Sequence, residues 1–433
     1  MLTDLERVAA VERAEPPEGL FADKDWLVSP TALPLTGKFV DELDRLGYRL
    51  WLFVRACNLL YQQSVKGRQP AWIADYLDRG KPEELREISR AREFRDDLPR
   101  VLRPDLVLTD AGYTIAELDN VPGGIGLTAW LNQTYAALGE DVIGGAEGMI
   151  DGFRSILPGG ADIVVSEEAA TYRPEMQWLA RQAGDGYTVR DAAYAPAGTP
   201  EAPRNVYRFF ELFDLPNIPA APDLMRKARE GGAKVTPPFK PYLEEKMWFA
   251  LFWLRPLREF WRRELSERHF LKLQEVIPYT WLMDPAPLPQ HAVIPLLEIH
   301  QWEELAHFSQ KQRELILKIS GFSETAWGSR GVELGTDLPQ AEWAAAIHRA
   351  LEQFPTHPHI LQKFHKGRLI EHPYRDRTGE LRTMQGRVRL CPYYFIFEGQ
   401  THLRGALATI CPADKKLLHG MKDAILTPGR VEG

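Results

Sequence analysis

The chain has 433 residues, a formal net charge of −7 and a pI of about 6.0. Hydrophobic residues make up 44% of it and charged residues 26%, the usual proportions of a folded globular protein. The length predicts two or three domains, and the acidic balance argues against a basic surface that binds nucleic acid.

The cysteines and the apolar segments indicate where the chain resides. Cys57, Cys391 and Cys411 are widely spaced and odd in number, which argues against disulfides and a cysteine zinc site. Residues 1–19 show no apolar secretory segment. The apolar stretch 247–254 is far shorter than the about 20 residues of a membrane span, so a buried helix face is favoured over a membrane partner. We therefore expect a cytoplasmic protein.

The N-terminal part is predicted to be mainly helical. Residues 1–30 are rich in Pro and Glu and are expected to be extended, whereas Leu43 and Leu46 follow a helical period within 36–64. A charged, solvated helix is expected at 83–95.

A β-hairpin is predicted next. The apolar runs 106–108 and 113–116 flank a turn of Asp and Gly character at 109–112. The glycine-rich loop 121–126 follows, and an amphipathic helix is expected from Leu127 onward.

The middle of the chain alternates strands with helices, which predicts a small α/β unit with a parallel sheet. Its predicted strands are 161–166, 186–189 and 205–210, its helix is 173–183, and its loops are 192–204 and 231–241. Beyond it we expect mostly helices over 242–276, and a strand at the end of the segment 312–319. A helix over 340–353, a strand at 360–364 and several strands from 387 to 410 are expected to follow.

Four charged residues stand at the ends of the predicted hairpin. Folding of the hairpin brings Asp105 close to Glu117 and Asp119, and carboxylate oxygens are the ligands that Mg²⁺ prefers. Arg103, two residues before Asp105, is placed to meet a phosphate oxygen. The alternative is a salt-bridged surface hairpin.

A second candidate site begins where a predicted strand ends at Lys318. The loop Ser320 to Gly331 contains small residues whose backbone N–H groups can fold over phosphates, while Lys318 supplies positive charge. It lacks the GKS or GKT of a Walker A loop, and an ordinary mobile turn is the alternative.

Two later strands could also meet an anion or a nucleotide. Gln362 and Lys363 lie in what resembles an edge strand, which could accept a purine with Lys363 reaching the phosphates. Arg387 and Arg389 alternate with apolar residues and so share one strand face, which favours either an anionic ligand or surface ion pairs.

Weaker signals come from a glycine loop and from histidines. Gly123 and Gly124, after Asn120, precede a helix whose N-terminus could bind an anion, with a simple tight turn as the alternative. The histidines between 357 and 372 lack HExxH spacing, so zinc is disfavoured.

Taken in order, these motifs resemble one family. Arg-x-Asp, eleven intervening residues and Glu-x-Asp resemble the magnesium and phosphate motif of the glutathionylspermidine synthetase family. That family commonly has asparagine at the last acidic position, and here Asp119 stands there with Asn120 beside it, so both are candidates for the third metal ligand. The loop after Lys318 and the strand with Gln362 and Lys363 resemble the family's nucleotide-binding part.

The resemblance implies a fold. The metal motif precedes the lysines, an order similar to that of the circularly permuted ATP-grasp group. The expected class is α/β (α+β), ATP-grasp-like and circularly permuted, with a small parallel-sheet accessory domain. The expected domains are 1–150 with the metal and phosphate motif, 151–235 as the α/β substrate-side domain, and 236–433 with a helical region and the nucleotide-binding part.

The resemblance also implies an activity, an ATP-dependent carboxylate–amine ligase that forms an amide through an acyl phosphate. It implies ATP and Mg²⁺ as cofactors, ATP between two sheets, and a small or peptide-like carboxylate and an amine as substrates, while a homodimer is left open. The implied residues are Arg103 for catalysis; Lys318, Ser320, Gly321, Gly328, Gly331, Gln362 and Lys363 for ATP; and Asp105, Glu117 and Asp119 for the metal. The family's substrate-contacting positions cannot be matched in this sequence, so Asn120, Gly123, Gly124 and Arg389 are only weak candidates for contact with a substrate or another anion. A kinase and a non-catalytic binding protein remain alternatives, and no cysteine amidase domain is found.

Overall fold

The computed structural model describes residues 2–20, 25–326, 330–418 and 422–432. The chain forms two compact units, each assembled from separate segments. Unit 1 comprises Met1–Trp51, Ala91–Phe239 and Lys366–Gly433, and unit 2 comprises Leu52–Arg90 and Lys240–His365. The units are interleaved along the chain, whereas the sequence led us to expect three consecutive domains. Helix α2 (Gly37–Val65) runs from the first unit into the second.

The large sheet of unit 1 contains the predicted hairpin. Its strand order is β1-β15-β14-β13-β2-β3, with β12 paired to β13, within the part of the chain that the structure describes. The strands are β1 (Leu33–Thr36), β2 (Val101–Thr109), β3 (Gly112–Asp119), β12 (Leu369–Arg375), β13 (Leu381–Phe397), β14 (Gln400–Pro412) and β15 (Ile425–Glu432). Antiparallel pairing of β2 with β3 confirms the hairpin, and β13 lies beside β2.

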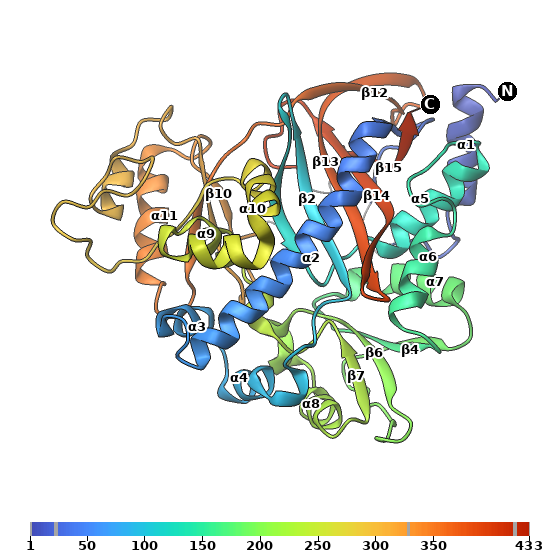
Figure 1. The fold of residues 1–433 in the computed structure, drawn as a ribbon. Coiled ribbons are helices and arrows are strands. Elements are labelled where there is room, and N and C mark those ends of the chain that lie inside the picture. The colour runs from blue at the N-terminus through green and yellow to red at the C-terminus, as the bar shows by residue number, and fades with distance from the viewer. Residues whose placement is uncertain (1, 21–24, 327–329, 419–421, 433) are drawn as a thin grey trace. The chain divides into compact units, whose positions relative to one another are not determined.

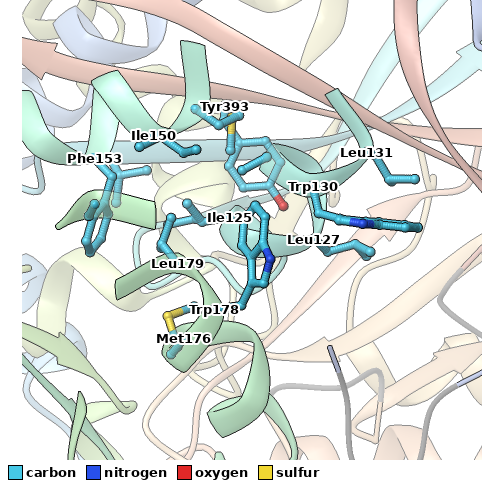
Figure 2. Packing of buried hydrophobic residues seen from close by; sticks show 14 of the residues in the cluster. Ile125, Leu127, Trp130, Leu131, Ile150, Phe153, Met176, Trp178, Leu179 and Tyr393 are labelled. Atoms are coloured by element: carbon cyan, nitrogen blue, oxygen red, sulfur yellow. The ribbon is translucent and has the colours of Figure 1, made fainter. Parts of the chain in front are cut away.

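Helices lie on both faces of this sheet. On one face α2 crosses β2 and β13 (Figure 1), and the Tyr394 hydroxyl donates a 2.6 Å hydrogen bond to the Leu43 carbonyl. On the other face Tyr393 packs in the main core among side chains from α5 (Ile125–Ala137), α6 (Gly148–Ile156) and α7 (Arg173–Ala183), as Figure 2 shows. Nearly every residue of α5 up to Tyr135 is buried, so this helix is not the amphipathic one that was expected.

The second sheet of unit 1 is parallel, as the alternation of strands and helices predicts. Its order is β5-β4-β6-β7, and every described pairing within it is parallel. The elements are β4 (Ala161–Val165), β5 (Tyr187–Arg190), β6 (Arg204–Phe209), β7 (Ala233–Thr236) and helix α8 (Ala221–Arg229). The prediction of a loop over 231–241 was wrong for β7, because so short a strand at a sheet edge carries too weak a pattern.

The N-terminus departs from its expected extended form. Residues Asp4–Ala14 form helix α1, whose N-cap Thr3 exchanges hydrogen bonds with Glu6 in a capping box. Val8 and Val11 bury one side of this helix. Local capping together with two buried valines therefore outweighs the Pro- and Glu-rich composition.

Unit 2 is built on an antiparallel sheet of order β10-β9-β11-β8. Its strands are β8 (Thr280–Leu282), β9 (Leu315–Ile319), β10 (Val332–Leu334) and β11 (His359–Lys363). One face packs on helix α11 (Gln340–Glu352), where Trp343, Ile347 and Leu317 belong to one hydrophobic core. The predicted strands and helix of this region are confirmed.

The remaining helices of unit 2 include the aromatic segment. They are α3 (Ala71–Leu77), α4 (Glu83–Arg90), α9 (Met247–Trp253) and α10 (Arg258–Val276). Helix α9 buries all its residues but Trp253, which confirms a core role for the apolar stretch. Helix α4 ends at Arg90 and buries Leu85 and Ile88, so it is shorter and less solvated than the helix expected over 83–95. Among the described residues, no helix combines the length and the apolarity needed to cross a bilayer.

Candidate functional site

The ends of the β2–β3 hairpin in unit 1 carry four charged residues opposite one another. Arg103 pairs with Asp119, and Asp105 pairs with Glu117. Because directly opposed residues and residues two apart on a strand share a face, all four side chains leave the same face. A bulge next to Asp105 shifts the register immediately beyond this group. Formation of the hairpin alone therefore gathers these charges.

Arg103 joins the two strands through its guanidinium group. Its Nε lies 3.1 Å from Oδ1 of Asp105, and its Nη2 lies 2.9 Å from Oδ2 of Asp119. Its Nη1 donates a 3.0 Å hydrogen bond to the Gly123 carbonyl. A guanidinium presents its donors in a rigid fork, so three such contacts fix its position. In this structure the Arg103 charge faces two carboxylates of the protein itself.

Asp105 is buried between two arginines. Arg389 on β13 places Nη1 3.3 Å from its Oδ2, and the Cys391 thiol donates to its Oδ1 at 3.4 Å. Burial raises the pKa of Asp105, but the Arg103 and Arg389 guanidinium groups outweigh burial and hold this pKa below its usual value. Burial also raises the pKa of Cys391 to about 12, which keeps it a thiol. Asp105 is therefore a firmly ionised partner of the arginines.

The two arginines expected to meet one anionic ligand have different surroundings. Arg387 and Arg389 are two apart on β13 and share a face. Arg387, however, donates to the backbone carbonyls of Gly367, at 3.0 Å, and of Ala413. It therefore ties backbone segments together, and of the two only Arg389 faces a carboxylate.

Glu117 and Asp119 are the carboxylates best placed to accept a cation. Burial and the neighbouring Glu117 raise the pKa of Asp119 above its usual value, although Arg103 opposes them. A cation beside this pair would relieve the repulsion, and carboxylate oxygens suit Mg²⁺. Within the described residues, no group of three or more His, Cys, Asp and Glu side chains is arranged to hold a metal ion. Glu117 and Asp119 could therefore supply two carboxylate ligands to Mg²⁺, whereas Asp105 is already paired with Arg103 and Arg389.

The glycine loop before α5 has a packing role. A Cβ on Gly123 would lie 2.6 Å from Cε1 of Tyr172, and Gly124 adopts a φ of 86° as the helix N-cap. At the helix N-terminus, the Leu127 amide donates a 3.1 Å hydrogen bond to the buried carboxylate of Glu175. A protein carboxylate therefore already lies where an external anion was expected, and buried Asn120 precedes this turn. Glu175, which belongs to α7, carried no local signal of this role.

A line of polar side chains crosses the sheet of unit 2. Lys318 on β9 donates a 2.9 Å hydrogen bond to Oε1 of Gln362 on β11. The Gln362 amide donates in turn to the hydroxyl of Thr280 on β8, at 3.1 Å. All three residues are buried and lie on the sheet face opposite to the core formed with α11. Thr280 was not anticipated, because a threonine beside an apolar strand is an ordinary residue there.

Lys363 is separated from Lys318. It pairs with Leu315, a residue of the core on the α11 side, whereas Lys318 pairs with Ile360 at the other end of the strand. The strand β11 lies between β9 and β8, so it is an interior strand rather than the expected edge. Alternation therefore directs the exposed Lys363 to the other face, and the structure does not bring the two lysines together.

The loop after Lys318 connects β9 to β10 as a hairpin. Added Cβ atoms would lie 2.9 Å from the Glu244 carbonyl oxygen at Gly321 and 2.5 Å from the Thr325 carbonyl oxygen at Gly331. Both glycines thus permit close backbone approach. Gly328 lies outside the described residues. Ser320, fully buried, accepts a 2.9 Å hydrogen bond from the amide of Met247, the first residue of α9.

Comparison with known proteins gives a likeness of structure only. No protein-family model matches the sequence, and no curated protein matches it. The fold is similar to that of a glutathione synthetase-like effector from Globodera pallida, solved in its apo form. The TM-score is 0.55 at 9% identity, covering 99% of this chain and 97% of that one.

A second solved structure, from Methylobacillus flagellatus, carries a provisional assignment as a γ-glutamylcysteine synthetase. It matches with a TM-score of 0.42 at 13% identity over 84% of this chain and 87% of that chain, a score too low to support an argument. The mixed α/β architecture is accordingly similar to the fold of the glutathione synthetase-like effector.

Proposed function

We propose that this protein is an ATP-dependent carboxylate–amine ligase of the circularly permuted ATP-grasp kind. The observation that carries the proposal is the group of charged residues at the end of the β2–β3 hairpin, where Arg103 contacts Asp105 and Asp119 opposite Glu117. Its occurrence in a chain with a glutathione synthetase-like fold supports the same reading. A stabilising ion pair needs one carboxylate, whereas phosphoryl transfer needs both cationic and anionic groups in one place.

In this proposal Lys318 and the loop that follows it contact the nucleotide. Lys318 offers a point charge to the phosphates, and Gln362 and Thr280 fix the direction of its amine. The backbone amide of Gly321 is proposed to approach a phosphate oxygen, whereas the Ser320 amide already donates a 2.9 Å hydrogen bond to the Pro358 carbonyl. Lys363, on the opposite sheet face, takes no part in this set.

The charged residues of the β2–β3 hairpin are proposed to act on the transferring phosphoryl group. Arg103 balances its negative charge, and Asp105, which is itself paired with Arg389, holds Arg103 in place. Glu117 and Asp119 are the residues that would hold Mg²⁺. Bound Mg²⁺ would neutralise charge on the phosphate oxygens.

The proposed reaction proceeds in two steps. The substrate carboxylate attacks the γ-phosphorus of ATP, the bond to ADP breaks, and an acyl phosphate forms. The nitrogen of the amine then attacks the acyl carbon, loses a proton and releases inorganic phosphate, leaving an amide. The carboxylate substrate is proposed to be a small or peptide-like molecule.

Binding of MgATP by titration calorimetry tests the proposal. We expect the wild-type protein to bind, the Glu117→Gln/Asp119→Asn variant to lose most of its Mg²⁺-dependent affinity, and the control Asp151→Asn to bind as wild type, because Asp151 is exposed on α6. Absence of binding by the folded wild-type protein would overturn the proposal.

One observation favours a second candidate, a non-catalytic binding protein with the same fold. Arg103 contacts the protein's own carboxylates, and the described residues include no three-ligand metal group. Screening amines and carboxylates for ADP release separates the candidates. Amine-dependent release supports a ligase, amine-independent release supports a kinase, and MgATP binding without turnover supports the binding protein.

A further inference from the structure

A buried ion pair in unit 2 lies outside every motif recognised in the sequence. Lys81, between α3 and α4, pairs with Oε1 of Glu245, two residues before the start of α9. The exposed fractions of their side chains are 1% and 2%. Burial of both charges is costly unless each is well paired, so the contacts of this pair indicate what it supports.

The second carboxylate oxygen of Glu245 leads to the loop after Lys318. It accepts a hydrogen bond from the Ser320 hydroxyl. The same hydroxyl accepts a 2.9 Å hydrogen bond from the Met247 amide, and the Ser320 carbonyl accepts one of 2.8 Å from the Lys246 amide. Ser320 is thus held through both its side chain and its backbone.

The next two loop residues also contact this ion pair. A Cβ on Gly321 would lie 2.9 Å from Cδ of Glu245, so the loop backbone lies directly against that carboxylate. Phe322 has a φ of 46°, an unfavourable backbone conformation for a residue other than glycine, which persists only where the surroundings hold it. The Lys81 Nζ lies 5.3 Å from the centre of the Phe322 ring.

We propose that Lys81 and Glu245 are positioning residues for nucleotide binding: they hold Ser320, Gly321 and Phe322 so that the loop amides that follow Ser320 can receive phosphate oxygens. The inference rests on the proposed function, because it assigns a cause for the loop's conformation rather than a new ligand. Buried ion pairs add little net stability, whereas they fix the atoms that they contact. A purely structural pair has no reason to end on three consecutive residues of one loop.

The test separates positioning from stability. In the Lys81→Met/Glu245→Met variant, apolar side chains of similar volume replace the pair without leaving a buried charge alone, so we expect the folded state to persist. The loop loses its attachment. We therefore expect faster hydrogen exchange over 320–326 and a Kd for MgATP raised on the order of tenfold, as small misplacements of binding groups cause. The melting temperature, exchange and calorimetric Kd are measured on the same preparations.

Asp78→Asn/Arg90→Met is the matched control. This variant removes another ion pair of unit 2, one whose Asp78 is buried and whose backbone carbonyl accepts from the Lys81 amide. We expect its stability to fall while its Kd for MgATP stays at the wild-type value. An unchanged Kd in the folded Lys81→Met/Glu245→Met variant overturns the inference alone. Failure of the wild-type protein to bind MgATP overturns the proposed function and this inference together.

Discussion

At the scale of single residues, Arg103 sets the charge balance of the hairpin group. It is the cation that contacts both Asp105 and Asp119, and its side chain is mostly buried. In the Arg103→Met variant, Asp105 keeps Arg389, but Asp119 loses its ion-pair partner beside Glu117. We expect a loss of about 3 kcal/mol of unfolding free energy in urea, the cost of breaking a buried ion pair. Equal stability of this variant and of a control at exposed Arg100, Arg100→Met, would contradict the interpretation.

His372 gives unit 1 a specific dependence on pH. Its Nε2 lies 2.9 Å from Oγ of Ser29, and both residues are buried. Burial lowers the pKa of His372 to about 4 from the usual value near 6.5. Between these values the unfolded chain binds a proton that the folded protein does not. The stability that neutral, buried His372 contributes is thus complete above pH 6.5 and declines as the pH falls toward 4.

We expect this histidine to account for about 2–3 kcal/mol of the stability lost between pH 7 and pH 4.5. Unfolding free energies of the wild type and of His372→Gln, measured at both pH values, check the expectation. The unfolding free energy of His372→Gln should fall by about 2–3 kcal/mol less than that of the wild type between pH 7 and pH 4.5. Identical losses in the two proteins would show that His372 does not titrate in this way.

At the scale of elements, helix α2 approaches β13 so closely that a glycine is required. A Cβ on Gly47 would lie 2.4 Å from Cδ1 of Tyr394. The Tyr394 ring is buried, and its hydroxyl donates a hydrogen bond to the Leu43 carbonyl of α2, so the ring cannot easily move away. Gly47→Ala gains about 1 kcal/mol of helix propensity but loses about 1–3 kcal/mol to overpacking. We expect net destabilisation, measured as a lower urea midpoint. Gly37→Ala is the control, because no atom of the residues that the structure describes lies within 4 Å of the Cβ position of Gly37, and this variant should not be destabilised.

Elements with a strong local pattern could be predicted from the sequence. The hairpin of β2 and β3, helix α2 and the parallel strands follow from turn residues and apolar periods. The hairpin charges share a face for the same local reason. What could not be predicted depends on distant partners. The interior place of β11, which separates Lys363 from Lys318, is set by pairing with β8 and β9, and Glu175 reaches the Leu127 amide from another helix. The sequence offered one sign that Glu245 is buried and paired: two glutamates and a lysine stand immediately before an entirely apolar helix.

At the scale of the whole molecule, the interleaving of the two units predicts what truncation does. A chain that ends at His365 retains every segment of unit 2 but lacks β12, β13, β14 and β15 of the large sheet. Strand β2 then has no β13 beside it, and the main core of unit 1 loses Cys391, Tyr393 and Phe395.

We expect hydrogen-exchange protection of the truncated chain to persist within 52–90 and 240–365 and to be lost over 101–119. The full-length chain, treated in parallel, should be protected in all three. Protection of 101–119 in the truncated chain would show that the hairpin is stable without its neighbour and would contradict the expectation.

The same interleaving has a consequence in time. A ribosome delivers the hairpin with Arg103 and Asp105 long before it delivers β13 with Arg389, because 283 residues separate Asp105 from Arg389. At about 5–20 residues per second, this interval lasts on the order of tens of seconds. During this interval Asp105 can form an ion pair with Arg103 but not with Arg389. The edge of β2 that β13 will later cover is then open to water and to other chains. The nascent protein therefore passes through a stage in which the strand pair that carries its candidate site lacks the neighbouring strand that later covers one edge.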